Sequence, residues 1–95
     1  MKKSGIELIS DERQKQIEKH GFTGEHHANH PEWYDNRQLI QAAETLLMPE
    51  IRSCFIPVNW DVEWFERLCK KSYKERLIIA GALIAAEIDR LESLK

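Results

Sequence analysis

The feature that most constrains this chain is a run of ten residues near the C-terminus, 77–86, in which no side chain is charged or strongly polar. Ser72 followed by Glu75 is typical of a capping box, in which the two side chains satisfy free amide groups at a helix start. From Tyr73 to about Leu94 there is no proline and only one glycine. A helix that is apolar on every face is normally buried on every face. The pattern therefore predicts an all-α domain built around a buried C-terminal helix.

The same helix indicates self-association, because one short chain has few other helices with which to cover it. Large apolar residues recur along it at helical spacing: Leu77, Ile84, Ile88 and Leu91. Gly81 and Ala85 are small and four positions apart, which would let another helix approach closely. We therefore expect a homo-oligomer, most simply a dimer.

Length and composition exclude several classes of protein. Ninety-five residues correspond to a single domain over residues 1–95, and 42% apolar with 32% charged residues is typical of a globular chain. A net charge of −2 without a clear basic patch argues against general nucleic-acid binding. The apolar stretch at 6–9 is too short for a signal peptide, and the run at 77–86 is too short to span a bilayer. We therefore expect no membrane association, a cytoplasmic protein, and reduced thiols at Cys54 and Cys69.

The rest of the chain predicts two or three further helices. The first covers about Gly5 to His20, and Gly21 suits a left-handed stop. Its apolar face is thin, which places the polar residues Arg13 and Gln16 near the core. Residues 21–34 contain two glycines and a proline, and they favour a loop.

A second helix is predicted from a cap at Asp35 or Asn36 to about Met48, where Pro49 follows. Residues 49–60 favour an irregular connection, and Asp61 can cap a short helix that ends near Cys69. The predicted architecture is thus three to four helices with two long irregular connections.

Aromatic residues and histidines are the main candidates for chemistry. All eight aromatic residues fall between Phe22 and Tyr73, where they either seal the core beneath the loops or line a pocket for a flat ligand. His26, His27 and His30 lie beside Glu25. Their rings either bond to the backbone of a tight loop, form a polar ligand site, or bind a metal ion. The loop context favours the first alternative, since zinc-binding histidine pairs usually need a helix to align them.

Signals for catalysis are weak. Acidic pairs at three-residue spacing occur about as often as random placement predicts, so they do not indicate a magnesium site. The glycine-flanked serine of hydrolases and the glycine-rich phosphate loops of nucleotide-binding folds are both missing from the sequence. The residues therefore favour a non-catalytic role without a metal or other cofactor.

Three stretches, residues 4–17, 21–30 and 80–91, together resemble a group of small phage- and prophage-encoded proteins. The shared pattern runs Glu-Arg-x-x-Gln, then Gly-aromatic-Thr-x-Glu-His-Asp-x-x-His, an Ala-Ala helix, a Trp-containing loop and Ala-Gly-Ala-Leu-Ile with Ala-Glu-Ile-Asp-Arg-Leu. It maps onto Glu12, Arg13, Gln16, Glu25, His26, His30, Ala42, Ala43, Trp60 and Glu87. The chain departs from it at His27, where the pattern usually has aspartate.

The resemblance implies a phage-type accessory protein, with no defined biochemical activity attached to it. The candidate ligand-binding residues are Glu12, Arg13, Gln16, Glu25, His26, His30 and Glu87. We expect them to bind a protein partner or a small ligand through a polar face. A looser similarity to MazG-type all-α nucleotide pyrophosphohydrolases leaves a Mg²⁺-dependent enzyme as the alternative. Those enzymes hold Mg²⁺ with paired acidic residues from two helices, and here Glu12 is followed by Lys15 and Glu87 by Arg90.

Overall fold

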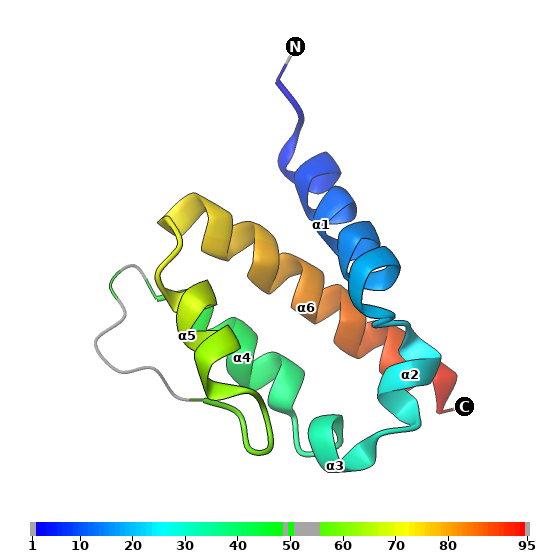
Figure 1. Cartoon of the computed structure of the whole chain (residues 1–95). Helices are drawn as coiled ribbons and strands as arrows, with labels where there is room; N and C mark the ends of the chain where they lie inside the picture. Colours follow the sequence, from blue (N-terminus) through cyan, green and yellow to red (C-terminus); the bar gives the residue numbers. More distant parts are fainter. Residues whose placement is uncertain (1, 49, 51–55, 95) are drawn as a thin grey trace.

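The computed structural model describes residues 2–48, 50 and 56–94. Over these residues the chain forms helices and no strand, which confirms the all-α class. The helices are α1 (Gly5–His20), α2 (Gly24–Ala28), α3 (Pro31–Tyr34), α4 (Gln38–Leu46), α5 (Val62–Cys69) and α6 (Tyr73–Ser93) (Figure 1). No helix in this described part of the chain is both long and apolar enough to cross a membrane.

The C-terminal helix α6 is the central packing element. Figure 1 shows it running through the middle of the molecule, with α4 and α5 on one side and α1 and α2 on the other. The core joins α4, α5 and α6 through fully or almost fully buried side chains, which include Leu39, Ala42, Leu46, Phe65, Ala80 and Leu83. The predicted role of the apolar run is therefore confirmed.

A single copy of the chain leaves one face of α6 uncovered. Ile79, Ala80, Ala82, Leu83 and Ala86 are buried within the run, whereas other large apolar side chains on the helix remain exposed. The exposed aliphatic ones are Leu77 (37%), Ile84 (40%), Ile88 (54%) and Leu91 (48%). The close approach expected at Gly81 occurs within the chain, because a Cβ atom there would lie 2.6 Å from Cδ1 of Ile9 on α1.

Helix α1 has the bounds that the sequence predicts. Ser4 and Glu7 form a capping box at its start, and Gly21 adopts a left-handed conformation (φ 66°) at its end. Arg13 and Gln16 are buried, as the thin apolar face indicated. Polar groups thus lie where α1 meets the rest of the molecule.

The prediction of a loop over residues 21–34 is wrong. Thr23 accepts a hydrogen bond from the backbone N–H of His26 (3.0 Å), and this cap starts α2. Pro31 occupies the first turn of α3, where its missing N–H costs nothing. The residues that normally break a helix here begin two short ones, which is why more helices form than the three or four expected.

The start of α4 also differs from the prediction. Neither Asp35 nor Asn36 caps it; the helix begins after Arg37, whose backbone is left-handed (φ 63°), and it ends at Leu46 rather than Met48. The side chain of Gln38 instead accepts the Asn36 N–H at 2.7 Å. By contrast, Asp61 caps α5 as expected, by accepting from the N–H of Trp64. Much of the second predicted connection, with Cys54 and Phe55, lies outside the described residues.

A candidate binding groove between α1, α2 and α5

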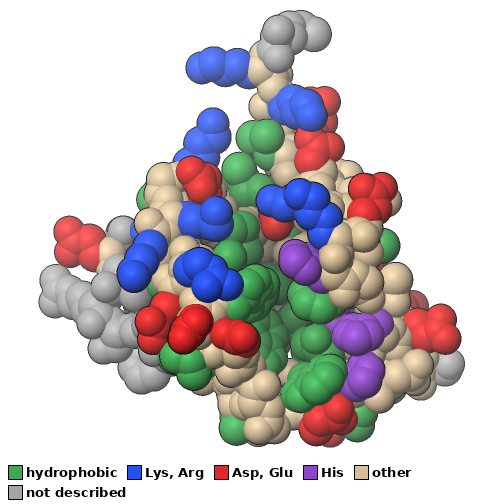
Figure 2. All heavy atoms as spheres, viewed as in Figure 1, with side chains coloured by type: hydrophobic (Ala, Val, Ile, Leu, Met, Phe, Trp, Pro, Cys, Tyr) green, Lys and Arg blue, Asp and Glu red, His purple; other side chains and the backbone are tan. Residues whose placement is uncertain are grey.

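A groove of about 1090 Å³ opens on the face of the molecule shown in Figure 2. Helices α1 and α2 form one wall, α5 and the segment before it form the other, and α6 forms the floor. Ile78, Ile79 and Leu83 line that floor. In Figure 2 hydrophobic side chains fill the groove and histidines lie along one side. Its volume slightly exceeds the usual range for small-molecule sites, which is about 300–1,000 Å³.

Aromatic side chains make up much of the lining, and a hydrogen bond fixes one of them in place. Trp60 donates from Nε1 to the carbonyl oxygen of Trp33 (2.9 Å). The neighbouring Asn59 donates from Nδ2 to the carbonyl oxygen of Glu32 (2.9 Å). These bonds hold the segment before α5 against α3, and the Trp64 ring lies 5.9 Å from that of Trp60. The wall is therefore largely preformed.

The two interpretations of the aromatic residues apply to different side chains. Phe65 is fully buried in the core, as the first interpretation predicts. Phe22, Trp33, Tyr34, Trp60 and Trp64 line the groove. These residues come from three segments of the chain, and the sequence does not place the segments relative to one another because they meet only in the fold.

His27 is the most unusual polar residue of the groove wall. It is 1% exposed, and its ring lies 4.3 Å from that of Tyr34 and 5.5 Å from that of Phe22. Burial, together with the positive charge of Arg13, lowers the pKa of His27 to about 4. The imidazole is therefore neutral at pH 7.

Two side chains in this wall have buried polar atoms without a hydrogen-bond partner in the described part of the chain. They are both ring nitrogens of His27 and Oε1 of Gln16. Phe22 links the two residues: its ring packs on the His27 ring, and its backbone N–H donates to the backbone carbonyl oxygen of Gln16 (3.2 Å). An unpartnered buried polar group costs about 1–3 kcal/mol, so two residues with such groups in one groove lining need an explanation.

The other histidines are held by ring packing. The His26 ring lies 4.6 Å from that of His30, which stacks on Trp33 at 4.5 Å. Nδ1 of His30 lies 3.2 Å from Oε1 of Glu32. Burial and the nearby His30 lower the pKa of His26.

The expected bonds from the rings to the loop backbone are absent for His27. Among the described residues no three His, Cys, Asp or Glu side chains are placed to hold a metal ion.

The structure brings together only some of the candidate residues. Glu12, Gln16 and His26 line the groove, and His30 lies beside His26. Arg13 is buried behind the wall, where it donates to Asp89 Oδ2 (2.8 Å) and to the Phe22 carbonyl oxygen (2.6 Å).

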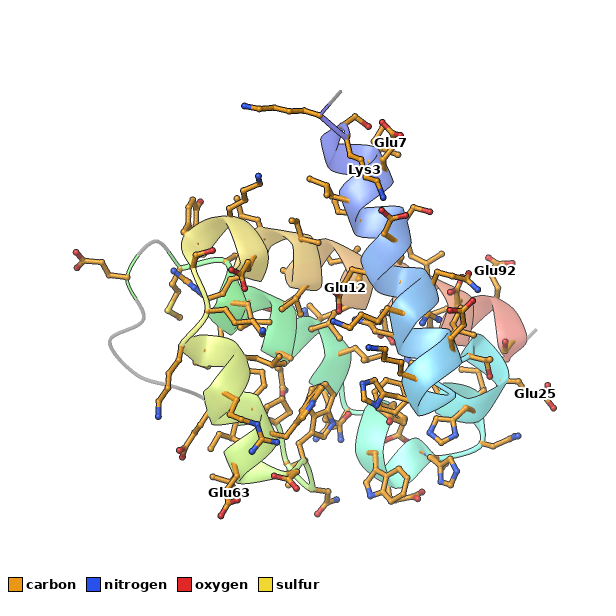
Figure 3. The ribbon with its side chains drawn as sticks, turned by 45° about the horizontal axis from the view of Figure 1, so that its top comes forward. Lys3, Glu7, Glu12, Glu25, Glu63 and Glu92 are labelled. Atoms are coloured by element: carbon orange, nitrogen blue, oxygen red, sulfur yellow. The ribbon has the colours of Figure 1, made fainter. Side chains whose placement is uncertain are left out.

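Glu25 and Glu87 lie away from this group. In Figure 3 Glu25 points outward from α2, whereas Glu12 lies between α1 and α6. Glu87 is buried in an ion pair with Arg90, with Oε1 2.6 Å from Nε. The role of the seven residues in ligand binding stays a prediction. The place of His27 in the wall was not predicted, and its position between two candidate histidines was the only signal for it in the sequence.

Comparison with known proteins gives no relative: no family model, curated protein or solved structure significantly matches this chain. The class that can be stated is therefore an all-α protein with an aromatic groove.

Gly24 sets how closely α2, and with it the histidine wall, approaches α6. A Cβ atom on Gly24 would lie 2.5 Å from the carbonyl oxygen of Asp89, which is backbone and cannot rotate away. We expect Gly24→Ala to lower the free energy of unfolding by about 1–3 kcal/mol, as overpacking does. The matched control is Gly5→Ala, because nothing lies within 4 Å of a Cβ atom there. Urea denaturation of both variants checks this, and equal stabilities would contradict it.

Proposed function

We propose that this chain is a non-catalytic binding protein whose groove takes a planar, uncharged small molecule. The observation that carries the proposal is a set of buried polar atoms on Gln16 and His27 that have no hydrogen-bond partner among the described residues and lie in a groove lined by aromatic rings. Small-molecule sites usually combine an apolar, aromatic lining with a few polar groups that fix orientation. The phage-accessory setting that the sequence resemblance implies, and a cytoplasmic location, belong to the same proposal.

The polar atoms indicate which chemistry suits the ligand. Oε1 of Gln16 can only accept a hydrogen bond, whereas a neutral imidazole at His27 offers one donor and one acceptor. A molecule with an N–H and a C=O on one edge, such as a lactam, complements both side chains. Its flat body fits beside the rings of Trp60 and Trp64, where stacking adds to burial. Reaching these atoms requires the wall to move slightly, because they are closed to solvent.

The Mg²⁺-dependent pyrophosphohydrolase remains the alternative, but no observation favours it. The enzyme would need carboxylates from two helices around one ion, with Mg²⁺ as its cofactor. Glu12 lines the groove, whereas Glu87 is bound to Arg90 and does not line it. A carboxylate neutralised by a buried guanidinium is a poor ligand for a second cation.

The test is a thermal-shift and tryptophan-fluorescence screen of planar bicyclic compounds. The compounds are used as matched pairs with and without a lactam edge, for example 2-quinolone against naphthalene. We expect lactams to raise the melting temperature of the wild type more than their hydrocarbon partners do. Gln16→Leu should abolish that difference. The unliganded variant should be at least as stable as the wild type, because it loses an unpartnered buried oxygen.

Gln14→Leu is the matched control, since Gln14 lies on the exposed side of the same helix and bonds only Glu18 in the described structure. Its lactam response should equal that of the wild type. If no planar compound changes the fluorescence or the melting temperature, the small-molecule proposal fails and a protein partner becomes the candidate occupant. If the Gln16→Leu variant binds lactams as well as the wild type does, the assigned polar contacts are wrong.

We also propose that the protein works as a homo-oligomer. Its support is the row of large apolar side chains that α6 leaves exposed, which is unusual for a monomer of this size when the residues form one contiguous face.

A further inference from the structure

The exposed face of α6 has the spacing of a helix-pairing surface. Leu77, Ile84, Ile88 and Leu91 follow one another at intervals of seven, four and three residues, and they are between 37% and 54% exposed. Residues at these intervals share one side of a helix and form the seam when two helices pack along their length. We call these four residues the α6 stripe.

The α6 stripe is nearly symmetric about its own midpoint. Leu77 and Leu91 are each seven residues from Ile84, which is two turns of helix. When two copies of α6 pack antiparallel about a two-fold axis at Ile84, each leucine meets the partner's leucine and Ile84 meets itself. A two-fold interface requires such a self-complementary patch.

The charges beside the α6 stripe favour the same antiparallel orientation. Lys74 and Glu92 are both exposed and are eighteen residues apart, which is five full turns and places them on the same edge of the helix. In the antiparallel pair Lys74 of one copy lies within about two residues, or roughly 3 Å along the axis, of the level of the partner's Glu92. A parallel pair would instead bring lysine to lysine and glutamate to glutamate, and it would align the two helix dipoles unfavourably.

We infer that two copies of the chain pair through antiparallel α6 stripes, an assignment that rests on the proposed self-association. The groove stays open in this dimer, because Ile78, Ile79 and Leu83 face the groove and the α6 stripe lies on the other side of the helix. One helix pair gives an interface near the small end of the specific range. The dimer is therefore weak, with a Kd on the order of 1–100 µM.

The experiment is sedimentation equilibrium of the full chain over a concentration series from about 1 to 300 µM, chosen to bracket that Kd. Ile84→Arg places two arginines against each other at the centre, and it should raise Kd at least ~30-fold, since like charges in an interface are strongly unfavourable. Val62→Arg is the matched control, because Val62 on α5 is a comparably exposed apolar residue (49%) away from the stripe. It should leave Kd unchanged. Circular dichroism confirms that each variant is folded, and Ile88→Arg provides a second disruption at a more exposed site.

Orientation is tested at low salt with Lys74→Glu and Glu92→Lys. Each single variant should raise Kd about 2- to 5-fold, and the double variant should restore it, because the exchanged charges again oppose each other. A dimer that survives both Ile84→Arg and Ile88→Arg would show self-association through another surface and overturn this inference alone. A chain that stays monomeric at 300 µM would overturn the proposed self-association as well.

Discussion

Replacing Glu87 by leucine should lower the free energy of unfolding by about 3–5 kcal/mol, the cost of leaving one member of a buried ion pair without its partner. The carboxylate of Glu87 accepts two hydrogen bonds from Arg90, at 2.6 Å from Nε and 3.1 Å from Nη2. Both side chains are about nine-tenths buried. The hydrogen bond to Glu87 raises the pKa of Arg90, so the guanidinium stays charged. A domain of this size has a total stability of roughly 5–14 kcal/mol, so the loss should be visible as partial unfolding on mild heating.

The double variant Glu87→Leu, Arg90→Met should recover most of that stability, because it removes both charges and fills the space with apolar atoms. Glu44→Leu serves as the control. Glu44 also pairs with an arginine, Arg37 at 3.6 Å, but both side chains are largely exposed, so little change is expected. Urea denaturation of the wild type, the two single variants and the double variant measures these differences in the free energy of unfolding. A Glu87→Leu variant as stable as the control would mean that the pair contributes nothing.

Acidification from pH 7 to pH 4 should lower stability by roughly 2 kcal/mol through His27 alone. The pKa of His27 falls from an ordinary 6.5 to about 4 in the folded protein. The unfolded chain therefore binds a proton between these pH values while the folded chain does not. Stability is full above pH 6.5 and declines as the pH falls toward 4. The full shift corresponds to about 3 kcal/mol, and we expect only part of it because movement of the groove wall lets solvent reach the ring in the folded protein.

Urea denaturation at half-unit steps between pH 7.5 and pH 4 measures this dependence. Leucine is apolar and of similar size to histidine. In His27→Leu the contribution of His27 to the slope of the unfolding free energy against pH should therefore vanish. His20→Leu removes an exposed histidine of α1 and should keep that contribution. Identical slopes in the wild type and in His27→Leu would show that the buried ring is not the source.

The sequence predicted the longest elements correctly because their signals are local. The run at 77–86, the stop at Gly21 and the cap at Asp61 each act on residues within one or two turns. The short helices were missed for the same reason. Thr23 and Pro31 can begin a helix or sit in a loop, and contacts with α6 decide between the two outcomes.

The groove was only partly predictable. The polar face of α1 pointed to Gln16, whose buried oxygen lies in the wall. His27 could not be placed, because its burial depends on the rings of Phe22 and Tyr34, which reach it from outside α2. Glu87 does not line the groove with Glu12, and its carboxylate is paired with Arg90, one turn along α6.

Helix α1 packs closely against α6 and against no other described helix to a similar extent. Its attachments include the contact between Ile9 and Gly81 and the pairing of Arg13 with Asp89. The core of α4, α5 and α6 does not depend on either. Local opening of such a peripheral element needs less free energy than global unfolding, so we expect α1 to detach at a lower free energy than the core unfolds. Because α1 carries one wall of the groove, the free energy of this local opening sets how often the buried polar atoms of Gln16 and His27 are exposed to solvent.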